Sequence, residues 1–175
     1  MAKVGLKYPV YKSGTKKGVI GKAIQADISI ATNEVYLYAD DQVAESDKSF
    51  RNGTITLIVD DLSDEIQTDF LGHAKAEGGE LTAKGTDNSP YVGIGFYGIK
   101  KVNNVQKYRA VWFPKVQFAE PNDTNQTKGE NTTFSTPTLT GTIMLDEDGK
   151  WKNEQTFATE AEAKAYLDGK AGIAA

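Results

Sequence analysis

The sequence predicts a mainly β protein, an antiparallel sandwich or barrel with one or two helices packed on its flank. Three observations lead to this prediction. Apolar and polar residues alternate at a period of two along much of the chain, residues that favour turns separate these runs, and only two segments have helical spacing. The chain has 175 residues, 39% of them hydrophobic, which is enough for one domain with its own core.

The alternating runs give the expected strands in chain order. On a strand, residues two apart share a face, so each run can bury one face against a core. The expected strands are 24–30, 35–39, 55–59, 92–96, 108–112, 116–118 and 139–145. Asn103 and Asn104 separate two of these runs, and Asn tolerates the left-handed conformation of a tight hairpin turn. The sequence Asp-Glu-Asp-Gly at 146–149 predicts a second turn.

Two segments have the residue order of a helix. Ser63 can cap the first, which carries acidic residues in its opening turn and ends at Gly72. Thr159 and Glu162 fit a capping box at the start of the second, and Gly169 predicts its end. The apolar stripe of the first helix comprises Ile66, Phe70 and Leu71.

Charge and loop length divide the chain further. Two long loops are expected, at 39–53 and 121–131, and long loops in a compact domain are commonly functional. Residues 1–22 carry six lysines and no acid, giving +6, whereas residues 23–80 carry thirteen acids against three bases, giving −10. The remainder balances, which leaves the net charge of −4. We therefore predict a basic N-terminal arm, 1–22, followed by a single domain, 23–175.

The basic arm has three interpretations. It is a solvated terminus, a segment that binds an anionic partner, or a patch that meets the acidic body of a neighbouring copy. Lysines and tyrosines are interleaved along it, as on some surfaces that bind single-stranded nucleic acid. The acidic body would repel phosphate at close range, so we expect no specific recognition of nucleic acid.

Catalytic and cofactor motifs are weak. Residues 93–98, Gly-Ile-Gly-Phe-Tyr-Gly, match the dinucleotide-binding fingerprint, but they read as a strand rather than as the start of a helix. We interpret the glycines as allowing close backbone approach between subunits or sheets. The only histidine, His73, follows a helix-ending glycine and suits the helix dipole there. Adjacent carboxylates at 40–41 and 60–61 point to opposite faces of a strand.

These patterns exclude several classes of protein. The chain has no cysteine, which excludes disulfide and zinc-thiolate scaffolds and suits a reducing cytoplasm. No apolar run is long enough for a membrane span. We predict that the protein is not an enzyme and that it holds no cofactor and no metal.

Several short motifs occur in a consistent order along residues 20–145. They are NEVYLYADD at 33–41, AE at 44–45, FRNGTITL at 50–57, DDL at 60–62, GFYG at 95–98, WFPKV at 112–116, TKGE at 127–130 and FSTPTLTG at 134–141. As an ordered set they resemble the major tail tube proteins of long, flexible-tailed bacteriophages.

The resemblance implies a β-sandwich subunit that forms hexameric rings, which stack into the hollow tail tube of the virion and conduct phage DNA into the host. It implies a loop, here 39–53, that reaches the next ring. Its implied partners are further copies of the chain, a tape-measure protein, a tail terminator and tail-tip or baseplate proteins, with assembly in the host bacterial cytoplasm. Phage DNA would pass without sequence-specific binding. Some members append an immunoglobulin-like domain, and we expect none here.

Charge pattern and resemblance together nominate residues that contact another subunit. Head-to-tail contacts need two different, complementary patches on each subunit. A basic patch on the arm and an acidic patch on the 39–53 loop would meet this need. The candidates are Lys12, Lys16 and Lys17 on the arm, and Asp40, Asp41, Glu45, Asp47 and Phe50 on the loop.

A hypothesis from another class stays open beside this one. The chain would be a monomeric, carbohydrate-binding β-sandwich with Tyr36, Tyr38, Trp112 or Trp151 as its platform. Sugar modules hold such rings in an exposed row, so buried rings would disfavour this hypothesis.

Overall fold

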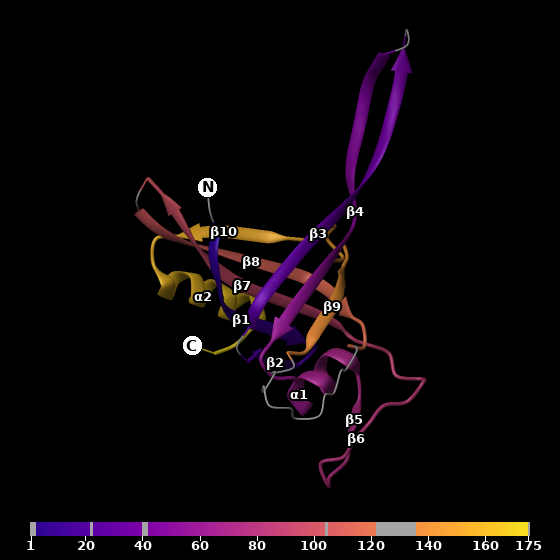
Figure 1. Ribbon diagram of the computed structural model, residues 1–175, viewed down its shortest axis with the longest axis vertical. Coiled ribbons are helices and arrows are strands. Elements are labelled where there is room, and N and C mark those ends of the chain that lie inside the picture. The colour runs from indigo at the N-terminus through magenta and orange to yellow at the C-terminus, as the bar shows by residue number, and fades with distance from the viewer. Residues whose placement is uncertain (1–2, 22, 40–41, 104, 122–135, 175) are drawn as a thin grey trace, which may run out of the picture.

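The computed structural model describes the chain except residues 1–2, 22, 40–41, 104, 122–135 and 175 (Figure 1). It confirms the prediction of a mainly antiparallel β protein with two flanking helical segments, the first of which continues from α-helix into a π-helical turn, η1. The elements are β1 (Lys3–Ser13), β2 (Lys16–Val19), β3 (Ala23–Ala39), β4 (Gln42–Val59), α1 (Asp64–Ile66), η1 (Gln67–Leu71), β5 (Ala74–Lys75), β6 (Leu81–Thr82), β7 (Tyr91–Val102), β8 (Val105–Phe118), β9 (Thr138–Ile143), β10 (Asn153–Phe157) and α2 (Glu160–Ala171).

Eight of the described strands form one antiparallel sheet. Its strand order is β2-β1-β7-β8-β9-β4-β3, and β10 pairs with β8 beside β9. Part of the segment that charge sets apart as a basic arm lies in this sheet, because β1 pairs with both β2 and β7. Sheets twist and curl, and here β1 comes into contact with β3 without a described strand pairing between them. The second expected loop, 121–131, lies almost wholly outside the described residues.

β3 and β4 form one long hairpin, which corrects two sequence expectations. Residues 24–30 and 35–39 belong to a single strand, and the expected loop at 39–53 is mostly strand, since β4 begins at Gln42. The pairing runs from the body outward until Ala39 lies opposite Gln42, and the outer half projects away from the body (Figure 1). Residues 42–53 show no sustained alternation of apolar and polar residues, which is the pattern that marked the expected strands in the sequence.

The helix caps follow the predicted chemistry. The Ser63 side chain accepts from the Ile66 N–H at 3.3 Å, and Gly72 ends the segment with φ of 78°. Thr159 and Glu162 form the predicted capping box of α2. The predicted end at Gly169 is wrong, because α2 continues to Ala171 and ends at Gly172, which has φ of 71°. Burial of Ala171 against the sheet outweighs the weak helix propensity of Gly169.

The predicted turns are present where the structure describes them. Asn103 has φ of 49°, the left-handed conformation expected between β7 and β8. In the 146–149 turn, the Asp146 carboxylate accepts from the N–H groups of Asp148 and Lys150 at 3.0 and 2.7 Å. Gly149 has φ of 75° there. Local side-chain chemistry therefore fixes both connections.

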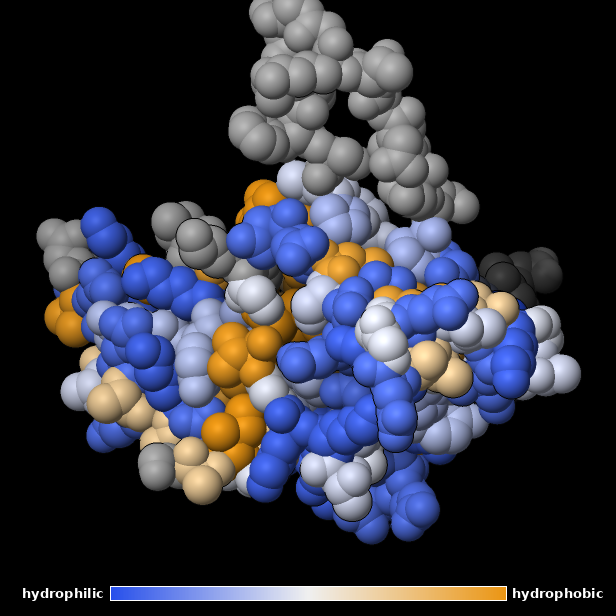
Figure 2. Space-filling model, turned by 90° about the horizontal axis from the view of Figure 1, so that it is seen from below, coloured by the Kyte–Doolittle hydropathy of each residue, from blue (hydrophilic) through white to orange (hydrophobic). Residues whose placement is uncertain are grey.

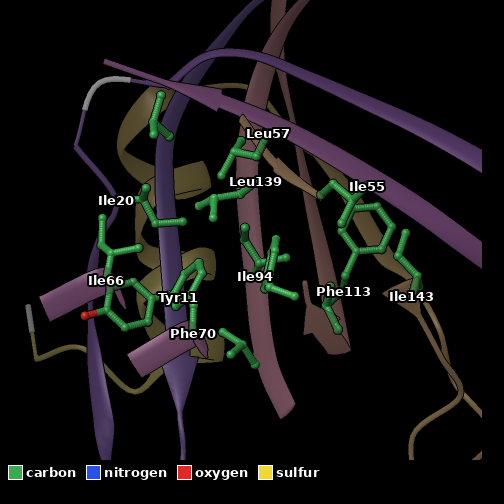
Figure 3. Packing of buried hydrophobic residues seen from close by; sticks show 14 of the residues in the cluster. Tyr11, Ile20, Ile55, Leu57, Ile66, Phe70, Ile94, Phe113, Leu139 and Ile143 are labelled. Carbon is green, nitrogen blue, oxygen red and sulfur yellow. The ribbon is translucent and has the colours of Figure 1, made fainter. Parts of the chain in front are cut away.

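Two hydrophobic clusters lie on opposite faces of the central strands. On β8, Phe113 belongs to the larger cluster and its neighbour Trp112 to the smaller one, as alternation requires. The larger cluster packs β4 and β9 and the helical segment 64–71 against β7 and β8 (Figure 3). The smaller cluster lies beneath α2. The sheet is therefore covered by a different helix on each side.

The glycines at 93–98 lie in β7, as predicted, and their close neighbours are of two kinds. A Cβ at Gly93 or Gly95 would lie 2.5 or 2.6 Å from the ring of Trp112, so these two glycines make room for an indole. A Cβ at Gly95 would also lie 2.9 Å from a backbone carbonyl oxygen of β8, and one at Gly98 would lie 2.9 Å from a backbone carbonyl oxygen of β1. Gly95 and Gly98 therefore allow close backbone approach between neighbouring strands of one sheet, and approach between subunits stays a prediction.

Candidate assembly surfaces

The three candidate lysines lie on the β1–β2 hairpin, and two of them have partners within the chain. Lys12 is exposed on β1. Lys16 Nζ lies 2.7 Å from the Asp69 carboxylate, and Lys17 Nζ donates to the carbonyl oxygen of Gly172. These two lysines tie the hairpin to both helical segments, so Lys12 is the candidate whose charge points to solvent.

Asp69 is a buried acid that binds three residues of the β1–β2 hairpin. Its carboxylate accepts from the Tyr11 hydroxyl at 2.8 Å and pairs with Lys16, and its carbonyl oxygen accepts from Ser13 Oγ at 2.7 Å. Burial and the hydrogen bond to the carboxylate raise the pKa of Tyr11. Asp69 was not among the residues nominated from the sequence. Its position three residues after Ile66 was the available signal, because residues three apart share a helix face.

α2 is fastened to the sheet by two tyrosines. The Tyr97 hydroxyl donates to the Glu160 carboxylate, and the Tyr8 hydroxyl donates to Asp168 at 3.0 Å. Burial and these bonds raise the pKa of both tyrosines, and the bond from Tyr97 lowers the pKa of Glu160. The chain's own helix therefore occupies this face of the sheet, with Leu167 buried beneath it.

The acidic candidates belong to the projecting β3–β4 hairpin. Glu45 and Asp47 lie on β4, but their side chains fall outside the described part of the structure, as do residues 40–41 altogether. Phe50 stacks on Trp151 at the base of the hairpin, with ring centroids 4.7 Å apart and planes 7° apart. Beyond this stack, the described backbone of 31–52 pairs only within the hairpin.

The inner half of β3 exposes an apolar row that the sequence analysis assigned to a buried face. Ile24 and Ile28 are 55% and 40% exposed, although Ile28 lies opposite the fully buried Ile55. A groove of about 330 Å³ runs beside this row, and Leu6, Phe96 and Val111 are among the apolar residues that line it. Figure 2 shows hydrophobic residues gathered in a band between polar areas on the face seen from below. Alternation of apolar and polar residues identifies the apolar face of β3, but it does not show what covers that face.

Among the described side chains, the candidate aromatic residues do not form the exposed row that a sugar-binding platform needs. Trp112 is buried at 5% exposure, and Trp151 is half-buried under Phe50. Tyr36 is exposed on the projecting hairpin and donates to Glu34 at 2.5 Å, while the side chain of Tyr38 is not described. The buried indole disfavours the carbohydrate-binding hypothesis.

The histidine and the paired aspartates considered for catalysis differ in exposure. His73 is buried and its Nε2 lies 3.0 Å from Glu120, while Asp60 and Asp61 are exposed. Within the described residues, no three histidine, aspartate or glutamate side chains gather as a metal site would require. None of the helices that the structure describes is long and apolar enough to cross a membrane.

Within the described residues, the β body has a projecting hairpin and a long strand edge without a strand partner, and such edges can pair with another chain. The model of the family described as phage tail tube protein matches residues 10–166. The chain therefore belongs to the phage tail tube protein family, which confirms the resemblance drawn from its motifs, and it is a structural component of the phage tail. No curated protein matches it.

Proposed function

We propose that this chain forms hexameric rings that stack into the hollow tail tube, the conduit through which phage DNA enters the host. The observation that carries the proposal is the β3–β4 hairpin in a chain of this family. Its outer part pairs only with itself in the described structure, and an isolated two-stranded hairpin is marginally stable in water. A neighbouring ring would supply the contacts that the hairpin lacks.

The charge distribution supports the stacking of rings and the passage of DNA through the tube. Residues 1–22 carry +6 and residues 23–80 carry −10, so one subunit holds two opposite patches that can meet on different copies. The net charge of −4 would disfavour attachment of DNA phosphates to the inner surface of the tube. DNA would therefore pass without sequence-specific binding. The tube role involves no catalysis and no cofactor. Further partners would be the tape-measure protein, the tail terminator and tail-tip proteins, and assembly would take place in the host cytoplasm.

The mass of the purified protein in solution tests self-assembly. Size-exclusion chromatography with light scattering should show species at multiples of the 19.0 kDa chain that grow with concentration, with six copies in one ring. A constant mass of one chain at every concentration and salt level would reject the proposal.

We propose that Lys12 faces the acidic hairpin residues of the next ring. Lys16 and Lys17 lie beside it on the β1–β2 hairpin and belong to the same basic patch. The acidic side of this contact comprises Asp40, Asp41, Glu45 and Asp47, with Phe50 at the hairpin base. Lys12 is the lysine to test, because Lys16 and Lys17 already have partners within the chain.

Charge reversal tests this contact. At low salt, Lys12→Glu should raise the concentration needed for tube formation roughly tenfold, and adding Asp40→Lys and Asp41→Lys should partly restore assembly. Lys84→Glu, at an exposed site on another part of the chain, is the matched control and should assemble normally. Turbidity and electron microscopy at two salt concentrations measure both effects. Normal assembly of Lys12→Glu would show that this charge is incidental.

A further inference from the structure

The β3–β4 hairpin leaves the body at four consecutive residues of β4, 50–53. They begin the motif FRNGTITL of residues 50–57. On the body side, β4 pairs with both β3 and β9 as far as Gly53, which lies opposite Ile30 and Ile143. Beyond Gly53, the described backbone of β4 pairs with β3 alone. The projecting part of the hairpin therefore begins at this motif (Figure 1).

A one-residue β-bulge lies at Arg51. Ala31 lies opposite Asn52, and the next residue of β3, Thr32, lies opposite Phe50, so Arg51 has no counterpart on β3. The pairing is regular for several residues on either side of this point. An extra residue of this kind bends its strand and increases the local twist. The bend therefore lies at the boundary between the body and the projecting part of the hairpin.

The bulge also determines the direction of the Phe50 side chain. Thr32 and Ile30 share a face of β3 because they are two residues apart, and residues directly opposite each other share a face. Phe50, opposite Thr32, therefore lies on the same face as Gly53, opposite Ile30. In a regular strand, residues three apart point to opposite faces. The extra residue Arg51 is thus what turns Phe50 toward the body.

The Phe50 ring is held there by a residue of the body. It stacks on Trp151, with ring centroids 4.7 Å apart and planes 7° apart, and both residues pack against the larger hydrophobic cluster. On the inner side of the bulge the packing is close, since a Cβ at Gly53 would lie 2.8 Å from the Ile30 side chain. Phe50 is the first residue beyond the bulge. The stack therefore joins the projecting part to the body across the bend.

We propose that the Arg51 bulge and the Phe50–Trp151 stack set the direction in which the β3–β4 hairpin leaves the subunit. The bulge supplies the bend, and the stack holds the bend at one angle. Arg51 and Trp151 are positioning residues, because they act through the projecting part of the hairpin. This inference rests on the proposed function, in which the hairpin must reach one place on the next ring.

The length of the hairpin makes this angle important. At the rise of a β-strand, the paired segment from Thr32 to Ala39 is about 23 Å long. A change of about 20° at its base would therefore move its end by about 8 Å, which is more than the spacing of two neighbouring strands. A hairpin displaced by this distance would miss the residues that it meets on the next ring.

Spin labels measure the direction of the hairpin in the dilute protein. The chain has no cysteine, so Ser46→Cys on β4 and Ala165→Cys on the exposed side of α2 give one defined pair. Deletion of Arg51 makes the ladder regular and leaves the stacking side chain on its face, so it removes the bend alone. It should shift the mean label distance by several ångströms. Trp151→Ala should broaden the distance distribution, and double electron–electron resonance measures both effects.

Assembly measures the consequence of a changed direction. Deletion of Arg51 and Trp151→Ala should each raise the concentration needed for tube formation about tenfold or more, by light scattering and electron microscopy. Arg51→Ala is the matched control, because it removes the charge and keeps the bulge, and it should assemble as the unchanged chain does. Trp151→Phe keeps an aromatic ring in the stack and should restore both the narrow distribution and assembly. Circular dichroism and thermal melting check the fold of each variant.

Three results would overturn the inference. The first is an unchanged label distance in the folded deletion variant together with an unchanged distribution in Trp151→Ala. The second is assembly of both variants at unchanged concentrations, and the third is an equal loss of assembly in Arg51→Ala. If the deletion variant does not fold, Trp151→Ala and Trp151→Phe decide between the same outcomes. Failure of the unchanged chain to assemble would reject the proposed function, and the label distances would still decide what sets the direction of the hairpin.

Discussion

A Gly95→Val variant should lose about 3 kcal/mol or more of its free energy of unfolding. Gly95 lies on β7 opposite Trp112, and a Cβ there would lie 2.6 Å from the indole and 2.9 Å from Leu167 of α2. Neither side chain can move aside without disturbing its packing, because Trp112 is buried and Leu167 is fully buried under the helix. The sheet and α2 would separate or the strands would shift.

Urea unfolding of the dilute protein, followed by tryptophan fluorescence, measures this loss. Gly85→Val is the matched control, because a Cβ at Gly85 meets nothing within 4 Å. It should change stability by less than about 0.5 kcal/mol. A Gly95→Val variant as stable as this control would show that β7, β8 and α2 do not pack as described.

Removal of the outer β3–β4 hairpin should abolish tubes while leaving the body folded. Asn33 lies directly opposite Ser49, so residues 34–48 can be replaced by Asn-Gly, which favours a two-residue hairpin turn. The deleted part pairs only with itself in the described structure, and none of its described side chains belongs to the core clusters, so the body should keep its fold. We expect rings or small oligomers but no stacks, by electron microscopy and light scattering.

A second shortened hairpin provides the control for this deletion. Lys75 lies opposite Leu81, so residues 76–80 between β5 and β6 can also be replaced by Asn-Gly. This variant should still form tubes. Tubes of normal length from the chain that lacks residues 34–48 would contradict the role given to the β3–β4 hairpin.

Local chemistry explains why much of the fold could be predicted from the sequence. Ser63 and Thr159 cap their helices through groups within a few residues, and Asn103 and Asp146 determine turns in the same way. Alternation identified the strand at 55–59 on β4, where Ile55 is buried, but it did not identify β1, although Val10 and Tyr11 are buried there. These signals depend on near neighbours, so the sequence carries them directly.

Other features depend on distant residues, and sequence patterns did not predict them. Residues 42–53 lack sustained alternation, so 39–53 read as a loop, although β4 begins at Gln42. Asp69 is buried because β1 brings Tyr11 to it across 58 positions of sequence. Ile24 and Ile28 alternate as core residues do, and only the strand order shows that β3 is an edge. Of the candidate lysines, the sequence could not show that Lys16 and Lys17 pair within the chain.

Electron microscopy of the purified chain tests tube formation itself. We expect hollow tubes or stacked rings, with six subunits around the axis, that become more abundant as protein concentration rises. Particles no larger than a single folded chain, at every protein and salt concentration examined, would contradict it.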